Sequence, residues 1–252
     1  MLYSERSAAI MNRLNQKNAV TVKELSKELN VSVDTIRRDL KNMEQNGLLV
    51  CVHGGACLPD LSSQFSPFNG REIIHVAQKQ ELVKKAIRFL KDGDMAAINS
   101  GTTGTVLAKE LAQTRVQATI VTNNIAVIGM LIGHPTIQVI ATGGLLDGKE
   151  QSLYGHDCEE AFLRYHYDIC FLSMNAVSLE DGYTDFRLNE IPNICLIAER
   201  SDYSVAVMDS SKLETTSKRT LFPINKIDCL VTDSLISPEL RRQYLESDIH
   251  LL

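Results

Sequence analysis

Six short apolar runs, four of which lead into a small polar segment that often contains glycine, constrain the fold of residues 95–232 more than any other feature. Amphipathic stretches separate the runs, and strands that alternate with helices are typical of a parallel sheet. The runs are apolar almost throughout, as expected where helices cover both faces of a sheet. The predicted strands are residues 95–99, 119–122, 137–142, 168–174, 204–209 and 229–232. A helix is predicted over 71–90, and residues 71–252 are predicted to form a mostly parallel α/β domain.

The N-terminal part of the chain differs from this body in charge. Residues 1–57 carry eight Lys or Arg against six Asp or Glu, whereas the whole chain of 252 residues carries 26 against 31. A mildly basic head on an acidic body is typical of a small module that meets a polyanion and a larger part that does not. A chain of this length also has room for more than one domain.

Composition and cysteine usage exclude several classes of protein. The chain is 44% hydrophobic and 23% charged, and no run approaches the ~20 apolar residues that a membrane span needs. The N-terminus has no basic segment leading into an apolar run, so we expect a cytoplasmic protein with no membrane partner. The six cysteines form no Cys-x-x-Cys pair. Neither a disulfide nor a zinc site at Cys51, His53 and Cys57 is therefore expected.

The first 47 residues contain the signals of three helices. Residues 4–17 are amphipathic, and Thr21 with Glu24 has the spacing of a capping box that opens a second helix. Ser32 can cap a third helix over 33–45, and Gly47 follows its end. Two helices joined by about three residues predict a helix-turn-helix.

The third helix carries residue types that read a DNA groove. Its first turns present Arg37 and Arg38 together with short polar side chains, whereas Ile36 and Leu40 fall on its apolar face. Arginine can bind guanine edges or neutralise phosphates, and serine and threonine can contact either. A solvated charged face is the alternative interpretation of the same pattern.

A predicted strand over 48–52 and a second short strand follow this helix, joined by His53, Gly54 and Gly55. The two glycines allow a tight turn and a close approach to a phosphate or minor groove, so this hairpin is predicted to be a wing. The residues predicted to contact DNA are Thr21, Ser32, Asp34, Thr35, Arg37, Arg38, His53, Gly54 and Gly55.

The run Ser-Val-Asp-Thr-Ile-Arg-Arg-Asp-Leu at 32–40, followed by His-Gly-Gly-Ala at 53–56, resembles the signature of the DeoR family of bacterial repressors. The resemblance extends over essentially the whole chain. It implies a winged helix-turn-helix over 1–57 and a sensor domain over 71–252 that is similar in fold to ribose-5-phosphate isomerase. Cys51 stands where that family usually has an arginine. The segment 58–70, rich in Pro, Ser and Gly, is predicted to be the linker between the two domains.

The segment after the first predicted strand of the body is the best candidate for binding a phosphate. Gly101 and Gly104 leave backbone N–H groups accessible, Thr102 and Thr103 add hydroxyls, and a predicted helix over 106–111 places its N-terminus there. The segment lacks the Gly-Lys-Ser/Thr ending of a nucleotide triphosphate loop, so a monophosphate suits it better. An ordinary strand-to-helix turn is the alternative.

By resemblance to the family, residues 100–103 hold the phosphate of a sugar effector, and polar residues after the other strands line the pocket. Asn99 stands where the family commonly has aspartate, Ala176 where it often has glycine, and the segment 191–194 where it has basic residues. Arg187 and His156 are expected to be surface residues. The predicted effector-binding residues are Asn99, Ser100, Gly101, Thr102, Thr103, Thr122, Asn123, Asn124, Gly143, Gly144, Asp181, Gly182, Asp209 and Lys212.

Three functions fit this organisation. The first is a repressor of carbohydrate genes that binds operator DNA as a homodimer or homotetramer, with a phosphorylated sugar as allosteric effector and no cofactor. The second is a sugar-phosphate isomerase, but the segment 175–178 lacks the acidic base expected there, and Asp181 lies in a turn signal. The third is a scaffold whose body only oligomerises, for which polar strand ends are not needed. The sequence favours the first, which is not an enzyme.

Overall fold

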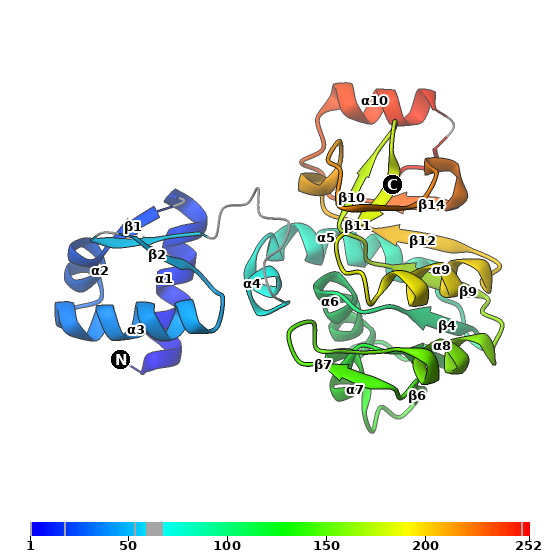
Figure 1. Ribbon diagram of the computed structural model, residues 1–252, viewed down its shortest axis with the longest axis horizontal. Helices are drawn as coiled ribbons and strands as arrows, with labels where there is room; N and C mark the ends of the chain where they lie inside the picture. Colours follow the sequence, from blue (N-terminus) through cyan, green and yellow to red (C-terminus); the bar gives the residue numbers. More distant parts are fainter. Residues whose placement is uncertain (1, 18, 53, 59–67, 248) are drawn as a thin grey trace. The chain divides into compact units, whose positions relative to one another are not determined.

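The computed structural model describes residues 2–17, 19–52, 54–58, 68–247 and 249–252 (Figure 1). The chain divides into two compact units, Met1–Ile74 and His75–Leu252. Most of the predicted linker lies outside the described residues, and the predicted domain limits stay a prediction. In the part of the chain that the structure describes, no helix has the length and apolar character that a membrane crossing needs.

The first unit contains the three predicted helices and a small antiparallel sheet. Thr21 and Glu24 form the predicted capping box, and the Ser32 side chain caps α3, so both predicted helix starts are confirmed. Ile36, Leu40 and Met43 lie on the buried face of α3, as predicted. The elements are α1 Tyr3–Lys17, β1 Ala19–Thr21, α2 Val22–Glu28, α3 Val33–Gln45, β2 Val50–Val52, β3 Gly55–Cys57 and α4 Phe68–Ile73.

The wing is the hairpin of β2 and β3, which pair antiparallel as predicted. The short strand β1 also pairs with β3, which places β3 at the centre of the sheet. The sequence did not predict β1, because its three residues continue directly into the cap of α2 and offer no period of their own.

The second unit is built on a sheet of six parallel strands in the order β14-β12-β9-β4-β5-β6 (Figure 1). Every predicted strand of the body is present in this sheet, so the predicted α/β fold is confirmed. The strands are β4 Met95–Ile98, β5 Ala118–Thr122, β6 Ile137–Ala141, β9 Ile169–Leu172, β12 Ser204–Val207 and β14 Cys229–Val231.

Alternate residues of each strand enter two separate cores, which explains why the strands are apolar on both faces. Ala96 and Ile98 pack with helices α5–α7, whereas Ala97, between them, packs with α8 and α9 on the other face. The result is a three-layer arrangement (Figure 1). The helices are α5 Val76–Ala86, α6 Thr102–Leu111, α7 Ile125–Leu131, α8 His156–Leu163, α9 Ile191–Glu199 and α10 Pro238–Glu246.

Five further strands were not predicted. They form an antiparallel sheet in the order β10-β11-β13 and a hairpin of β7 with β8. The predicted helix over 71–90 is also interrupted, because α4 ends at Ile73 and His75 adopts a left-handed φ of 54° before α5 begins. The additional strands are β7 Leu145–Asp147, β8 Ser152–Tyr154, β10 Ala176–Ser178, β11 Gly182–Asp185 and β13 Arg219–Phe222.

Candidate functional site

The exposed face of α3 carries polar side chains that were predicted to contact DNA. Ser32, Asp34, Arg37 and Arg38 are exposed, and Thr35 is half-buried. The Ser32 hydroxyl accepts from the Thr35 backbone N–H at 3.1 Å and lies 2.8 Å from its Oγ1. Ser32 and Thr35 therefore shape the start of the helix, and the two arginines are the long side chains that can reach beyond it.

Arg37 contacts Asp34 on the same face of the helix. Its Nη1 lies 3.3 Å from Asp34 Oδ1, and the two side chains are 68% and 85% exposed. An ion pair this exposed contributes little to stability, because water screens it. A phosphate or a guanine edge can therefore replace Asp34 as the partner of Arg37 at small cost.

A groove of about 660 Å³ lies between the start of α2, α3 and the wing. Arg37 lines it from α3, and Cys51 lines it from the wing. Burial and the neighbouring Glu44 carboxylate hold the pKa of Cys51 above its ordinary value, so this thiol offers no positive charge and little thiolate. The residues that line the groove are Thr21, Val22, Lys23, Val33, Arg37, Leu40, Cys51, Gly54 and Gly55.

Thr21 and the glycines of the wing have structural roles at this groove. The Thr21 side chain is occupied in the capping box with Glu24. Gly54 has a φ of +82°, and a Cβ on Gly55 would lie 2.1 Å from the Val20 carbonyl oxygen. The turn therefore requires both glycines whether or not DNA is bound. His53, which was predicted to contact DNA, lies outside the described residues.

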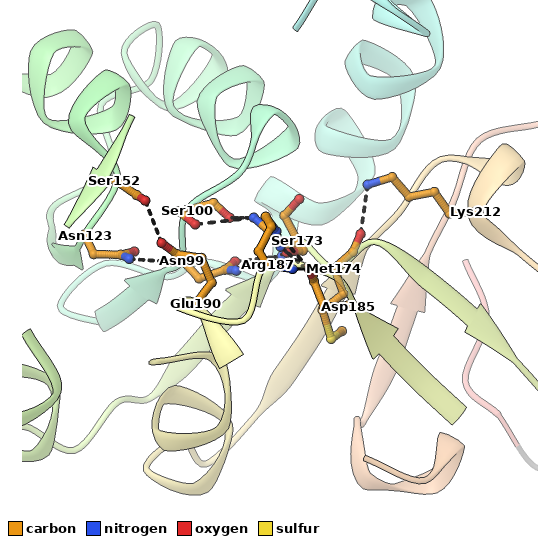
Figure 2. Close-up of polar contacts among 10 residues, drawn as sticks. All are labelled: Asn99, Ser100, Asn123, Ser152, Ser173, Met174, Asp185, Arg187, Glu190 and Lys212. Atoms are coloured by element: carbon orange, nitrogen blue, oxygen red, sulfur yellow. Dashed lines mark hydrogen bonds and ion pairs between the residues drawn. The ribbon is translucent and has the colours of Figure 1, made fainter. Parts of the chain in front are cut away.

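In the second unit, polar side chains gather where the strands of the parallel sheet end (Figure 2). Residues 99–101 connect β4 to α6, with Gly101 as the N-cap at a φ of 140°. Helix α6 begins at Thr102, four residues earlier than predicted, so Thr102 and Thr103 form its first turn. Thr103 is fully buried, and its Oγ1 has no hydrogen-bond partner. A buried hydroxyl left in this state marks a place where a further group can bind.

Three of the predicted polar residues are occupied by contacts within the protein. Asn99 donates to the Ser173 carbonyl at 3.0 Å and accepts from the Ser173 N–H at 2.7 Å, which ties the end of β4 to the end of β9. Thr122 donates to the Ile98 carbonyl at 2.6 Å. Asn124 caps α7 and donates to the Gly101 carbonyl at 3.1 Å. These residues shape the site.

Asn123 belongs to a buried polar cluster that the sequence did not predict. Its Nδ2 donates to Glu190 Oε2 at 2.8 Å, and the Ser152 hydroxyl donates to Glu190 Oε1 at 2.5 Å (Figure 2). The Glu190 residue is 1% exposed. Asn123 Oδ1 is buried without a partner, so it can accept a hydrogen bond from a ligand hydroxyl.

The expectation that Arg187 lies on the surface was wrong, whereas His156 is exposed as expected. Arg187 follows β11, and its guanidinium forms a buried ion pair with Asp185 at 2.6 Å. It also donates to Ser100 and Ser173, so it lies under the candidate phosphate segment (Figure 2). The burial of Arg187 was not predicted because charged residues are usually exposed to solvent, and Arg187 does not follow a strand of the parallel sheet.

Asp209 and Lys212 lie beyond β12, and Lys212 Nζ donates to the Met174 carbonyl at 2.9 Å (Figure 2). Burial alone would raise the pKa of Asp209. The positive charge of Lys212, the hydrogen bond from Ser211 and the nearby His75 and Lys79 outweigh burial and hold that pKa below its usual value. The Asp209 carboxylate is thus ionised at neutral pH.

Four other predicted effector residues lie in turns next to the sheets, and their contacts are with other parts of the protein. Gly143 and Gly144 follow β6, and a Cβ on Gly144 would lie 2.6 Å from the Tyr154 carbonyl oxygen. Asp181 and Gly182 form the turn between β10 and β11, where Asp181 accepts from Thr216. This turn is at the other end of β11 from Asp185. A role for these four in effector binding stays a prediction.

Among the described residues, no group of three or more His, Cys, Asp or Glu side chains could hold a metal ion. All the cysteines are free thiols. Burial raises the pKa of the Cys158 thiol to about 11, so it stays protonated at neutral pH.

Comparison with known families accounts for both units. Residues 6–61 match the model of the DeoR-like helix-turn-helix domain, and residues 74–234 match that of the DeoR C-terminal sensor domain. The chain belongs to the DeoR family. It is 33% identical over 245 residues to the HTH-type transcriptional regulator GolR of Listeria innocua, covering 97% of this chain and 96% of GolR.

A second relative is the HTH-type transcriptional repressor GlcR of Bacillus subtilis, 30% identical over 235 residues and covering 93% of this chain and 90% of GlcR. Among solved structures, ribose-5-phosphate isomerase A from Methanocaldococcus jannaschii has a TM-score of 0.40 and 15% identity, over 54% of this chain and 53% of the isomerase.

Proposed function

We propose that this DeoR-family member is a cytoplasmic repressor of genes of sugar metabolism, and that a phosphorylated sugar bound in the second unit alters its affinity for operator DNA. The family match over both units supports regulation of transcription. GlcR is named a transcriptional repressor, which supports repression rather than activation of the target genes. The relatives with at least 30% identity named above are regulators, which favours a protein that is not an enzyme.

The observation that carries DNA binding is the exposed polar face at the start of α3. Arg37 and Arg38 are exposed on this face, and Arg37 lines the groove beside the wing. This arrangement suits a helix that enters the major groove while the wing approaches the backbone. Because operators of such proteins are two-fold symmetric, we propose a homodimer or homotetramer. Cys51 stands where the family usually has an arginine, so it adds no positive charge to the groove. The basic residues that line the groove are Arg37 and Lys23.

The effector half of the proposal depends on the strand ends of the second unit. The N-terminus of α6 favours an anion, and Gly101 allows the chain to turn into it. Thr103 Oγ1 and Asn123 Oδ1 are buried polar atoms without partners near this turn. A ligand with a phosphate and hydroxyl groups would satisfy them: the phosphate at residues 100–103 and a hydroxyl at Asn123.

The test of DNA binding is fluorescence anisotropy of the full chain on DNA from upstream of its own gene, at fixed salt because phosphate contacts dominate affinity. Arg37→Ala should weaken specific binding by about 1–3 kcal/mol if Arg37 reads a base. Arg88→Ala removes another exposed positive charge, from the second unit, and is the matched control. If Arg37→Ala binds the operator as tightly as the unaltered protein, Arg37 does not read a base.

The test of the effector repeats this titration with a panel of phosphorylated sugars and their unphosphorylated parents. One phosphorylated sugar should change operator affinity about 5–150-fold, which corresponds to a coupling of about 1–3 kcal/mol. Its parent should have no effect. If no sugar phosphate changes tight operator binding, the sensor half of the proposal fails. If the protein instead converts a sugar phosphate and ignores DNA, the isomerase interpretation replaces it.

A further inference from the structure

Arg187 uses every hydrogen-bond donor that a guanidinium has. Nε donates to Asp185 Oδ1 at 3.0 Å, and Nη2 donates to Asp185 Oδ2 at 2.6 Å and to the Ser173 carbonyl at 2.8 Å. Nη1 donates to the Ser100 carbonyl at 2.9 Å and to the Ser100 hydroxyl at 3.3 Å. The guanidinium therefore has no donor left over for a ligand.

The charge of Arg187 is also balanced inside the protein. The Arg187 and Asp185 side chains are 2% and 0% exposed, and they bind each other through two hydrogen bonds. A buried bidentate pair is fixed in geometry. Its net charge is zero, so attraction of an anion by charge alone is not its main effect.

The pair joins segments that are far apart in the sequence. Through Ser100 it holds the end of β4, through Ser173 the end of β9, and through its own backbone the end of β11 (Figure 2). Asn99 ties the same two strand ends by its amide. The guanidinium thus cross-links the ends of β4, β9 and β11 next to the segment that leads into α6.

The segment 100–103 also packs closely against Arg187 and Ser173. A Cβ on Gly101 would lie 2.7 Å from Ser173 Oγ and 3.4 Å from Arg187 Nη1. Gly101 therefore packs closely against the side chain of Ser173, whose backbone carbonyl Arg187 binds, and against Arg187 itself. Because Arg187 also binds Ser100, we expect a shift of its guanidinium to change the direction of the N–H groups of residues 101–103.

We propose that Arg187, clamped by Asp185, is the positioning residue of the phosphate site: it fixes the 100–103 backbone in an anion-binding conformation without touching the anion. This inference rests on the proposed function, in which residues 100–103 bind the phosphate of the effector. It also predicts that geometry matters more than charge at position 187. Lysine keeps the charge but cannot reproduce the planar fork of donors.

The experiment is calorimetric titration of the full chain with inorganic phosphate, at a temperature where circular dichroism shows every variant folded. Arg187→Lys should weaken phosphate binding at least about tenfold. Asp185→Asn, which is nearly isosteric, should also weaken it, because the guanidinium loses the acceptors that fix it. Arg200→Lys is the matched control, since Arg200 is a half-buried arginine that donates to the Tyr165 carbonyl before β12 begins.

The sign of the Asp185→Asn effect separates positioning from attraction by charge. An unpaired positive charge at Arg187 would tighten phosphate binding, so tighter binding in this variant would overturn the proposal. Unchanged binding in Arg187→Lys would overturn it as well and leave the proposed function standing. No saturable phosphate binding by the unaltered protein would overturn both this inference and the sensor half of the proposed function. A purely structural role would lower the melting temperature and leave the dissociation constant of the folded protein unchanged.

Discussion

Gly54 and Gly55 are neighbours in the wing, yet replacing them by alanine should have very different consequences. At Gly54 a Cβ meets no heavy atom within 4 Å, and only the φ of +82° resists it. A left-handed conformation costs a non-glycine residue roughly 1–2 kcal/mol. The loss of flexibility in the unfolded chain returns about 0.4–1 kcal/mol. Gly54→Ala should therefore destabilise the first unit by only about 1 kcal/mol.

At Gly55 the obstacle is the backbone of the neighbouring strand. A Cβ there would lie 2.1 Å from the Val20 carbonyl oxygen and 3.1 Å from the Thr21 Cα. The strands must separate by about 1 Å to reach an ordinary contact, which breaks hydrogen bonds worth about 1 kcal/mol each. Because β3 is the central strand, Gly55→Ala should destabilise the unit by roughly 3 kcal/mol or more.

Amide hydrogen exchange of the full chain, read on peptides that cover β1 and β3, measures this difference. We expect near-normal protection in Gly54→Ala and loss of protection in Gly55→Ala. Operator affinity below the unfolding temperature should follow the same order, because the wing supports the groove beside α3. Equal protection in the two variants would show that the close approach of β1 to β3 does not exclude a side chain at position 55.

Three further changes test other contacts. Thr21→Ala removes the capping box of α2 and should lower the free energy of unfolding by about 1 kcal/mol in chemical denaturation. Because the folded-state pKa of Asp209 is below its unfolded value, its ionisation stabilises the fold above about pH 4. The advantage of the unaltered protein over Asp209→Asn should therefore shrink as urea titrations move below that pH, and a constant difference down to pH 3 would contradict the assignment. Asn123→Asp would place a carboxylate against Glu190 and should cost about 1–3 kcal/mol at neutral pH. Stability should then recover on acidification, when the pair takes up a proton.

The parallel sheet could be predicted from the sequence because each strand is a short apolar run between helical segments. The caps at Thr21 and Ser32 could be predicted for a similar reason, since a local hydrogen bond fixes them. Strand β10 and the strands that follow it in the antiparallel sheet carry mixed polar and apolar residues. Their pairing depends on long-range packing, which a local pattern does not contain.

The candidate site could be predicted only where it follows the strands of the parallel sheet. Residues 99–103 and 122–124 were found by the rule that ligands bind at the carboxyl ends of such strands. Asp185, Arg187 and Glu190 lie between β11 and α9, and that rule does not reach them. Asp185 and Arg187 are buried as a pair, whereas the buried Glu190 carboxylate accepts hydrogen bonds from Asn123 and Ser152. Such partners come from distant parts of the chain, so an isolated carboxylate or guanidinium in a sequence gives no signal of its burial.

A polar strand end is a binding site only where some of its polar groups are left for a ligand. Asn99, Thr122 and Arg187 direct their side chains to backbone carbonyls or to buried partners, which makes the edge rigid and leaves those groups unavailable. Thr103 and Asn123 each keep a buried polar atom without a partner, and these atoms lie on the two segments that Asn124 joins. An effector that satisfies both atoms would bridge the first turn of α6 and the residue that follows β5. Thr103→Val removes the hydroxyl that the effector would bind, so this variant should bind the effector more weakly. Its operator affinity in the absence of sugar should be unchanged, because Thr103 belongs to the second unit and the DNA-binding face to the first.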